Sequence, residues 1–146
     1  MNAETILVPT DFSSCGDAAL KYATALAHSM GAKLLIVHVE EPPLAYGGGE
    51  MYYGIAEPDQ KEIERMLAAV RPTRDDVPHE SRIITGAPAD AIVDLAAEVD
   101  ADMIVMGTHG RTGLGRLLMG SVAELVVRRA GCPVLTVRQS SDVATA

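Results

Sequence analysis

One stretch decides how this chain folds: Gly107-Thr-His-Gly110-Arg-Thr-Gly113-Leu-Gly115-Arg-Leu-Leu-Met-Gly120-Ser121. It contains five of the 13 glycines. The apolar run 103–106 precedes it, and residues 122–129 follow it with the periodicity of a helix. A strand, a glycine-rich loop and a helix start, in this order, can cradle a phosphate. Glycine lets the backbone approach a ligand, and the first amides of the helix point at the anion.

Two common phosphate-binding patterns do not account for this loop. No lysine lies between Gly107 and Gly131, so the Walker A pattern is absent. The dinucleotide pattern lacks its third glycine after Gly115 and would belong in the first strand–helix turn of the chain. The spacing Gly107-x2-Gly110-x9-Gly120-Ser121 remains. On these residues alone, a phosphate cradle and a tight turn that merely packs a helix on a sheet are both open interpretations.

The rest of the chain alternates between strand and helix patterns. Helices are predicted with apolar residues at helical spacing, and the strands are short apolar runs. This alternation predicts an α/β fold with a doubly wound, five-stranded parallel sheet in the flavodoxin-like order 3-2-1-4-5 and helices on both faces. We expect a single domain over 1–146 with its core in 4–138. The predicted strands are 5–9, 33–39, 79–85, 102–107 and 132–137, and the predicted helices are 16–30, 59–70, 89–99 and 121–130.

Composition limits the classes of partner. The formal net charge is −8, which disfavours nucleic acid and anionic membranes. No apolar run approaches the roughly 18 residues of a membrane span, and the start lacks the basic residues of a leader. We therefore expect a soluble, cytoplasmic protein. The charge reverses locally, because four arginines between Gly107 and Gly131 face one acid, Glu124. The four are Arg111, Arg116, Arg128 and Arg129. Arg128 and Arg129 are assigned to the C-terminal end of their helix dipole, so the local positive charge that indicates a small polyanion rests on Arg111 and Arg116 in the loop.

Asp11 follows the first predicted strand, where ligands bind in open α/β sheets. Its carboxylate could accept from a ribose hydroxyl or help to hold a metal with a bound phosphate, and it could equally form an Asx-turn or cap a helix. Ser13 or Ser14 is expected to cap the first helix, and Gly31 to end it. In a sheet of the predicted order, Asp11 and Gly107 follow neighbouring strands and face one crevice.

Several other features have predominantly structural interpretations. Cys15 and Cys132 belong to no metal or CxxC pattern and are predicted to be small buried residues. His38, alone in a strand, is predicted to be a structural imidazole with a satisfied hydrogen bond. The irregular segment 40–57 is predicted to be a mobile loop, either a cover near the site or an excursion without a role. The polar tail 139–146 is expected to fray.

From residue 4 to residue 138 the chain resembles the universal stress protein family, UspA-like proteins, in its ATP-binding branch. The resemblance is carried by a set of motifs in a fixed order. They are Ile6-Leu-Val-Pro-Thr-Asp11, Leu35-Ile-Val-His-Val39, Gly86-x-Pro88, Met106-Gly107-Thr-His-Gly110-Arg111, Gly120-Ser121-Val122 and Cys132-Pro133-Val134.

The resemblance implies ATP as the ligand, with Mg²⁺ or Mn²⁺ as an accompanying ion near Asp11. It places the adenosine beside the first strand and the phosphates at the glycine loop. It also implies a homodimer formed through the last strand, Val134 to Val137, and a regulatory role with a protein partner that the sequence does not name. The implied nucleotide-binding residues are Pro9, Thr10, Asp11, Val39, Met106, Gly107, His109, Gly110, Arg111, Gly120, Ser121 and Val122.

Three functions from different classes remain open. The first is a nucleotide-dependent regulatory module without catalytic residues. The second is a slow ATPase or a nucleotidyl-transferring enzyme, for which His109 is the acid–base candidate, although no histidine pair and no loop lysine support it. The third is a dimeric interaction protein that binds no nucleotide, against which the intact Gly107, Gly110 and Gly120 spacing argues.

Overall fold

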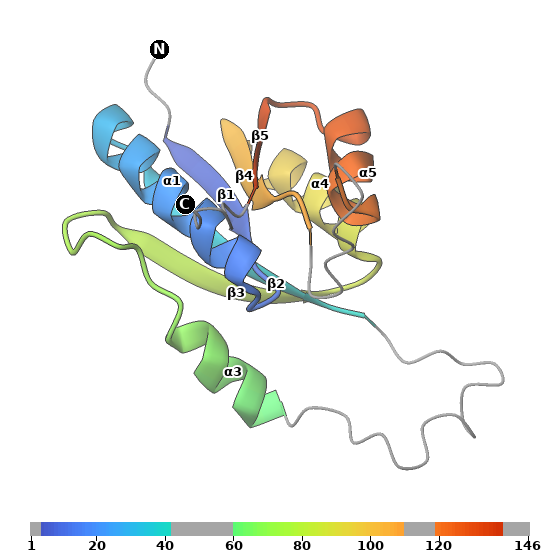
Figure 1. Ribbon diagram of the computed structural model, residues 1–146, viewed down its shortest axis with the longest axis horizontal. Coiled ribbons are helices and arrows are strands. Elements are labelled where there is room, and N and C mark those ends of the chain that lie inside the picture. The colour runs from blue at the N-terminus through green and yellow to red at the C-terminus, as the bar shows by residue number, and fades with distance from the viewer. Residues whose placement is uncertain (1–3, 42–59, 110–118, 139–146) are drawn as a thin grey trace, which may run out of the picture.

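The computed structural model describes residues 4–41, 60–109 and 119–138, which form a five-stranded parallel sheet with helices on both faces (Figure 1). The strand order is β3-β2-β1-β4-β5, as predicted. The strands are β1 (Thr5–Pro9), β2 (Lys33–Glu40), β3 (His79–Thr85), β4 (Met103–Gly107) and β5 (Val134–Val137). The helices are α1 (Ser14–Met30), α3 (Gln60–Ala68), α4 (Pro88–Glu98) and α5 (Ser121–Arg129).

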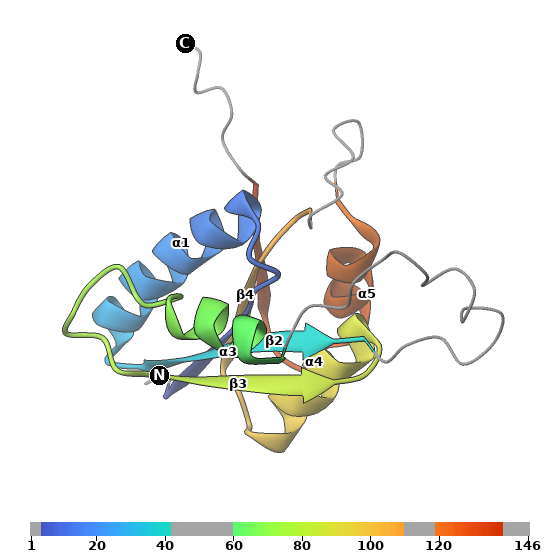
Figure 2. The same cartoon turned by 90° about the horizontal axis from the view of Figure 1, so that it is seen from below.

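Two apolar clusters hold the layers together. One face of the sheet packs against α1 and α3, and the opposite face packs against α4 and α5 (Figure 2). The central strands supply both clusters, because alternate residues of β1 point to opposite faces: Ile6 and Val8 to one, Leu7 to the other. All three are fully buried or nearly so. No helix in the described part of the chain is both long and apolar enough to cross a membrane.

Some predicted boundaries shift for identifiable reasons. Helix α1 begins at Ser14, two residues earlier than predicted, because the Ser13 side chain caps it by accepting from Gly16 N. It ends where predicted, with Gly31 in the left-handed region at φ 71°. Strand β5 begins at Val134 rather than at 132, since Pro133 has no N–H to donate. The predicted loop 40–57 begins too early, because β2 continues to Glu40. The rest of that loop from residue 42 on, the predicted Pro58 start of the second helix and the tail 139–146 lie outside the described residues.

The prediction that both cysteines are buried holds for Cys15 and is wrong for Cys132. Cys132 is only half-buried because it lies in the turn before β5, with one side against the α4–α5 cluster. Burial, and to a lesser degree the Asp102 carboxylate, raises the pKa of the Cys132 thiol. The thiol is therefore held protonated, which makes it a poor nucleophile or metal ligand.

The two edge strands differ in chemistry. On β3, the carboxylate of Glu80 forms ion pairs with Arg82 and with Lys33 of β2. On β5, Leu135 is 38% exposed, and nearby Tyr22 of α1 is 57% exposed. One edge of the sheet is therefore charged and the other carries exposed apolar side chains.

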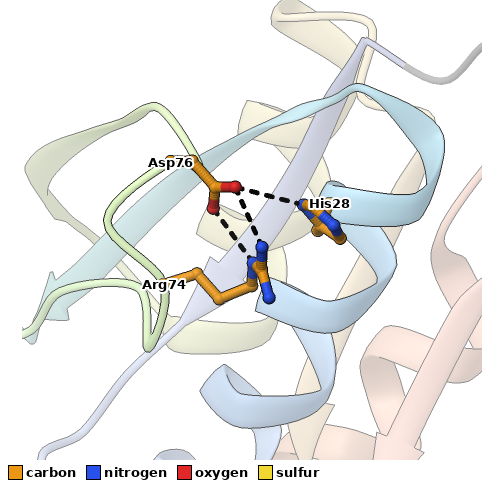
Figure 3. Close-up of polar contacts among 3 residues, drawn as sticks. All are labelled: His28, Arg74 and Asp76. Atoms are coloured by element: carbon orange, nitrogen blue, oxygen red, sulfur yellow. Dashed lines mark hydrogen bonds and ion pairs between the residues drawn. The ribbon is translucent and has the colours of Figure 1, made fainter.

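The segment that leads into β3 is tied to the outer end of α1 (Figure 3). Asp76 accepts two hydrogen bonds from the Arg74 guanidinium, at 3.0 and 2.9 Å, and lies 3.6 Å from Nδ1 of His28. The Arg74 hydrogen bonds hold the pKa of the Asp76 carboxyl below its usual range. Beneath this exposed cluster, the buried Thr24 hydroxyl donates to Leu20 O and accepts from Thr73 N.

At the opposite end of the strands, Asp102 joins the beginnings of β1 and β4. Its Oδ2 accepts from the amides of Glu4 at 2.7 Å and Thr5 at 3.0 Å. These two backbone hydrogen bonds, that of Thr5 first, lower the pKa of the Asp102 carboxyl, while desolvation opposes them. The ionised form is therefore the one that stabilises the fold.

The variant Asp102→Asn is expected to unfold about 1 kcal/mol more easily at neutral pH, because hydrogen bonds to an ionised acceptor are stronger than those to an amide oxygen. A carboxyl with a lowered pKa stabilises the folded state above its ordinary pKa of 3.8, and that stabilisation is lost as the pH falls through the folded-state pKa. Urea unfolding at several pH values should therefore show that the difference in unfolding free energy between wild type and Asp102→Asn becomes smaller below about pH 4. A difference that stays constant in acid, or an equal difference for Asp94→Asn at an exposed position of α4, would contradict this assignment.

Candidate functional site

The carboxyl ends of β1 and β4 lie side by side at the same end of the sheet, where the strands finish. The two strands pair in parallel, with Ile6 opposite Met103 and Leu7 opposite Ile104. The residues that follow the two strands therefore lie at the same end of the sheet. They are Thr10 and Asp11 after β1, and Thr108 and His109 after β4. The sequence prediction that these segments follow neighbouring strands is confirmed.

The turn between β1 and α1 is built from its own side chains. Thr10 N continues the strand pairing by donating to Val37 O at 2.8 Å, and Thr10 Oγ1 accepts from Phe12 N at 3.0 Å. Asp11 Oδ1 accepts from Ser13 N at 3.0 Å, which is an Asx-turn. One oxygen of Asp11 therefore has a structural role. Of the interpretations that the sequence left open for Asp11, the Asx-turn is present in the fold.

His38 of β2 reaches across to this turn. Its Nδ1 lies 3.0 Å from Thr10 O, and its ring contacts that of Phe12 with the centroids 4.6 Å apart. The predicted role of His38 as a satisfied structural imidazole is confirmed. Phe12 has a positive φ of 67°, which sequence reasoning missed, because Phe is an unusual residue for that region of the backbone.

Gly107 makes room for α1. A Cβ at this position would lie 2.7 Å from Sγ of Cys15 and 3.1 Å from its backbone carbon. Cys15 is buried, and its thiol donates to Val137 O at 3.3 Å, so it contacts the ends of both β4 and β5. The absence of a side chain at Gly107 therefore has a packing reason within the protein.

Thr108 joins the two ends of the glycine loop. Its N–H donates to Val137 O at 2.9 Å, and its C=O accepts from Gly120 N at 2.6 Å. Its side chain is buried and lies 3.2 Å from Nδ1 of His109. The start of α5 is thereby fixed beside the end of β4. Sequence reasoning overlooked Thr108, although a polar residue directly after a buried strand is a usable signal.

The start of α5 offers backbone donors. Gly120 is the N-cap residue and makes no side-chain cap hydrogen bond, whereas α1 is capped by Ser13. The first amides of a helix have no partner within the helix, and the helix dipole favours negative charge there. Ser121 is exposed in this first turn and Val122 is half-buried. The end of β4 thus has an uncapped helix start beside it.

The remaining predicted site residues divide into two groups. Pro9, Val39 and Met106 lie at the carboxyl ends of β1, β2 and β4, with Met106 buried in the sheet. Gly110 and Arg111 lie outside the described residues.

The two arginines near the end of α5 form ion pairs. Arg128 pairs with Glu124 at 3.1 Å, and Arg129 pairs with Asp90 of α4. Both arginines lie in the last turn of α5, as the helix-end interpretation predicted, and their ion pairs are an additional contact that the sequence did not indicate.

A cavity of about 500 Å³ lies between α3 and β3, and its lining includes Glu40 and Glu64 but no cationic side chain. That lining suits a phosphate poorly and contains none of the predicted site residues. In 4–41, 60–109 and 119–138 there is no group of three metal-ligating side chains.

The sequence model described as the Universal stress protein family matches residues 2–138. The chain belongs to this family. A universal stress protein of Thermus aquaticus is 39% identical over 136 residues, covering 92% of this chain and 98% of that relative.

Solved structures show the same fold. A universal stress protein in complex with cAMP is 34% identical, with a TM-score of 0.63 over 94% of this chain and 98% of its own. The universal stress protein from Archaeoglobus fulgidus in complex with dAMP is 29% identical, with a TM-score of 0.65 over 94% and 99%. Both of these family members were solved with an adenine nucleotide.

Proposed function

We propose that this universal stress protein binds an adenine nucleotide, ATP foremost, at the edge of the sheet where β1 and β4 end. The observation that carries the proposal is the hydrogen bond from Gly120 N to Thr108 O, 2.6 Å long. It places the uncapped start of α5 beside the end of β4, next to the turn that carries Asp11. A helix start of this kind binds phosphate through backbone amides.

The assignment of roles combines this geometry with the family resemblance. The amides at Ser121 and Val122 bind phosphate oxygens, and Gly107, His109, Gly110 and Arg111 complete the phosphate side. Pro9, Thr10, Asp11, Val39 and Met106 form the adenosine side, since they lie at the ends of β1, β2 and β4. The relatives solved with cAMP and dAMP support an adenine base.

Asp11 has part of its carboxylate available for the ribose or for an ATP-bound Mg²⁺ or Mn²⁺. Its Oδ1 already accepts from Ser13 N, so the Asx-turn fixes the orientation of the carboxylate. A carboxylate oxygen has lone pairs beyond that one hydrogen bond, and hard cations prefer such oxygens. The metal would therefore be held mainly by phosphates, with Asp11 as one protein ligand.

The protein acts as a regulatory module in the cytoplasm, where nucleotide binding sets the state that a partner protein recognises. Slow hydrolysis is the alternative, with His109 as its acid–base group. The contact of Thr108 Oγ1 with Nδ1 of His109, at 3.2 Å, instead supports a positioned loop side chain. Steady release of phosphate that His109→Ala abolishes would favour the enzyme.

Two copies associate through β5. This strand is an edge of the sheet, its Leu135 side chain is exposed, and an unprotected edge tends to pair with another chain. The charged β3 edge is unsuited to the same contact.

Native mass spectrometry tests ligand and assembly together. The expected particle contains two chains and one adenine nucleotide per chain after ATP is added, and GTP in a matched titration should bind more weakly. Protein that stays free of nucleotide at millimolar ATP would refute the ligand assignment. A particle of one chain would refute the assembly.

A further inference from the structure

The turn of residues 10–13, named here the Asp11 turn, contains one unfavourable backbone conformation. Phe12 has a φ of 67°, in the left-handed region that a bulky side chain rarely adopts. Such residues persist only where the surroundings hold them, and they gather at functional sites. Interactions around Phe12 must therefore hold the Asp11 turn in place.

The backbone of this turn is bound to β2 on two sides. Thr10 N donates to Val37 O at 2.8 Å, and Thr10 O lies 3.0 Å from Nδ1 of His38. A carbonyl oxygen only accepts, so Nδ1 of His38 carries the hydrogen. His38 is therefore the donor in this contact, which binds the strand to the turn.

The same imidazole also supports Phe12. The two rings lie with their centroids 4.6 Å apart and their planes inclined at 34°, within the range of favourable aromatic pairs. His38 therefore makes two different contacts to one turn from the neighbouring strand, a hydrogen bond to Thr10 and a ring contact to Phe12. Asp11 lies between these two anchored residues, and its bond to Ser13 N depends on the same conformation.

We propose that His38 is a positioning residue for nucleotide binding, which holds the Asp11 turn in the conformation that presents Asp11 to the ligand. The proposal rests on the proposed function. His38 precedes Val39, so β2 contributes to the adenosine side both directly and through the Asp11 turn. The ligand affinity then depends on the fraction of molecules whose turn is correctly formed.

Two substitutions separate the two contacts of His38. His38→Asn keeps an N–H donor near the position of Nδ1 and removes the ring, whereas His38→Phe keeps a ring and removes the donor. His38→Phe is expected to raise the dissociation constant for ATP by no more than about fivefold, because losing one net hydrogen bond lowers the fraction of molecules with a formed turn by at most that factor. His38→Asn should recover part of this loss. His79→Phe, on exposed β3, is the matched control and should bind as the wild type does.

Hydrogen exchange of the amides reports on the turn without any ligand. In His38→Phe, the amides of Phe12 and Ser13 should exchange about fivefold faster, while those of core residues such as Leu35 and Val105 keep their rates. Phe12→Leu removes only the ring contact at a half-buried position, and it should accelerate the same two amides. This variant keeps the test available if His38→Phe does not fold.

Distinct results would overturn the proposal. Unchanged ATP affinity in His38→Phe, with wild-type binding intact, would show that the Asp11 turn needs no support from His38. Equal acceleration at Leu35 and Val105 would indicate a general loss of stability instead of a local effect. If the wild type binds no nucleotide, the proposed function fails. Unchanged exchange at Phe12 and Ser13 would then refute the role of His38 independently.

Discussion

Replacing Gly120 by Val is expected to abolish nucleotide binding and to leave the fold intact. Gly120 has φ −74° and ψ 167°, an extended conformation that Val adopts without strain. Its N–H would still donate to Thr108 O. The branched side chain, however, would stand at the N-cap of α5, in front of the amides that bind phosphate. Losing several hydrogen bonds to a charged ligand weakens binding about 100-fold or more.

Calorimetric titration with ATP measures the affinity of Gly120→Val, and thermal unfolding measures its stability. Gly131→Val is the matched control, because a Cβ at Gly131 meets nothing within 4 Å. Gly120→Ser adds a side chain that caps helices well, so its hydroxyl should compete with the phosphate and give an intermediate affinity. An unchanged affinity of Gly120→Val would place the phosphates elsewhere. Gly110→Val carries the same expectation from the sequence, at a position outside the described residues.

Gly107→Ala is expected to destabilise the protein by about 3 kcal/mol, at the upper end for overpacking. The new methyl group would lie 2.7 Å from Cys15 Sγ and 3.1 Å from the backbone carbon of Cys15. The start of α1 would have to move away from the sheet, because the backbone cannot rotate aside as a side chain can. Urea unfolding measures the loss, and Gly131→Ala should show almost none.

A double-mutant cycle tests the mechanism of this loss. Cys15→Ala removes Sγ, the atom nearest to the new methyl group, but leaves the backbone and Cβ contacts. The double variant should therefore be more stable than the sum of the two single losses predicts, with only partial recovery. Additive losses would show that the strain at Gly107 does not arise from Cys15.

The layers and the strand order follow from the sequence because they rest on periodic apolar residues. The continuous apolar run Ile6, Leu7 and Val8 and the helical spacing of Ala19 and Ala23 are visible in the sequence, and these residues supply the two clusters. The ends of the elements were less predictable. Strand β5 begins two residues later than predicted, because Pro133 has no N–H to donate. Such ends depend on single hydrogen bonds, which periodicity does not reveal.

The candidate site was predictable where glycine spacing and strand ends determine it, and unpredictable where contacts cross between strands. Asp11 and Gly107 were placed after neighbouring strands from the strand order alone. The contacts of His38 with Thr10 and Phe12, and of Gly107 with Cys15, join residues far apart in the chain. No local pattern indicates such pairs, and the positive φ of Phe12 contradicts the ordinary preference of that residue.

The unequal edges of the sheet have a consequence for assembly. If β5 pairs with β5 of a second copy, each chain uses its apolar edge once and exposes only the ion-paired Glu80 edge outward. Head-to-tail pairing of β5 with β3 would instead leave an unpaired β5 strand after every addition, which would allow the assembly to grow into an open filament. If the chains pair through β5, the charged β3 strand would therefore end the assembly at two copies.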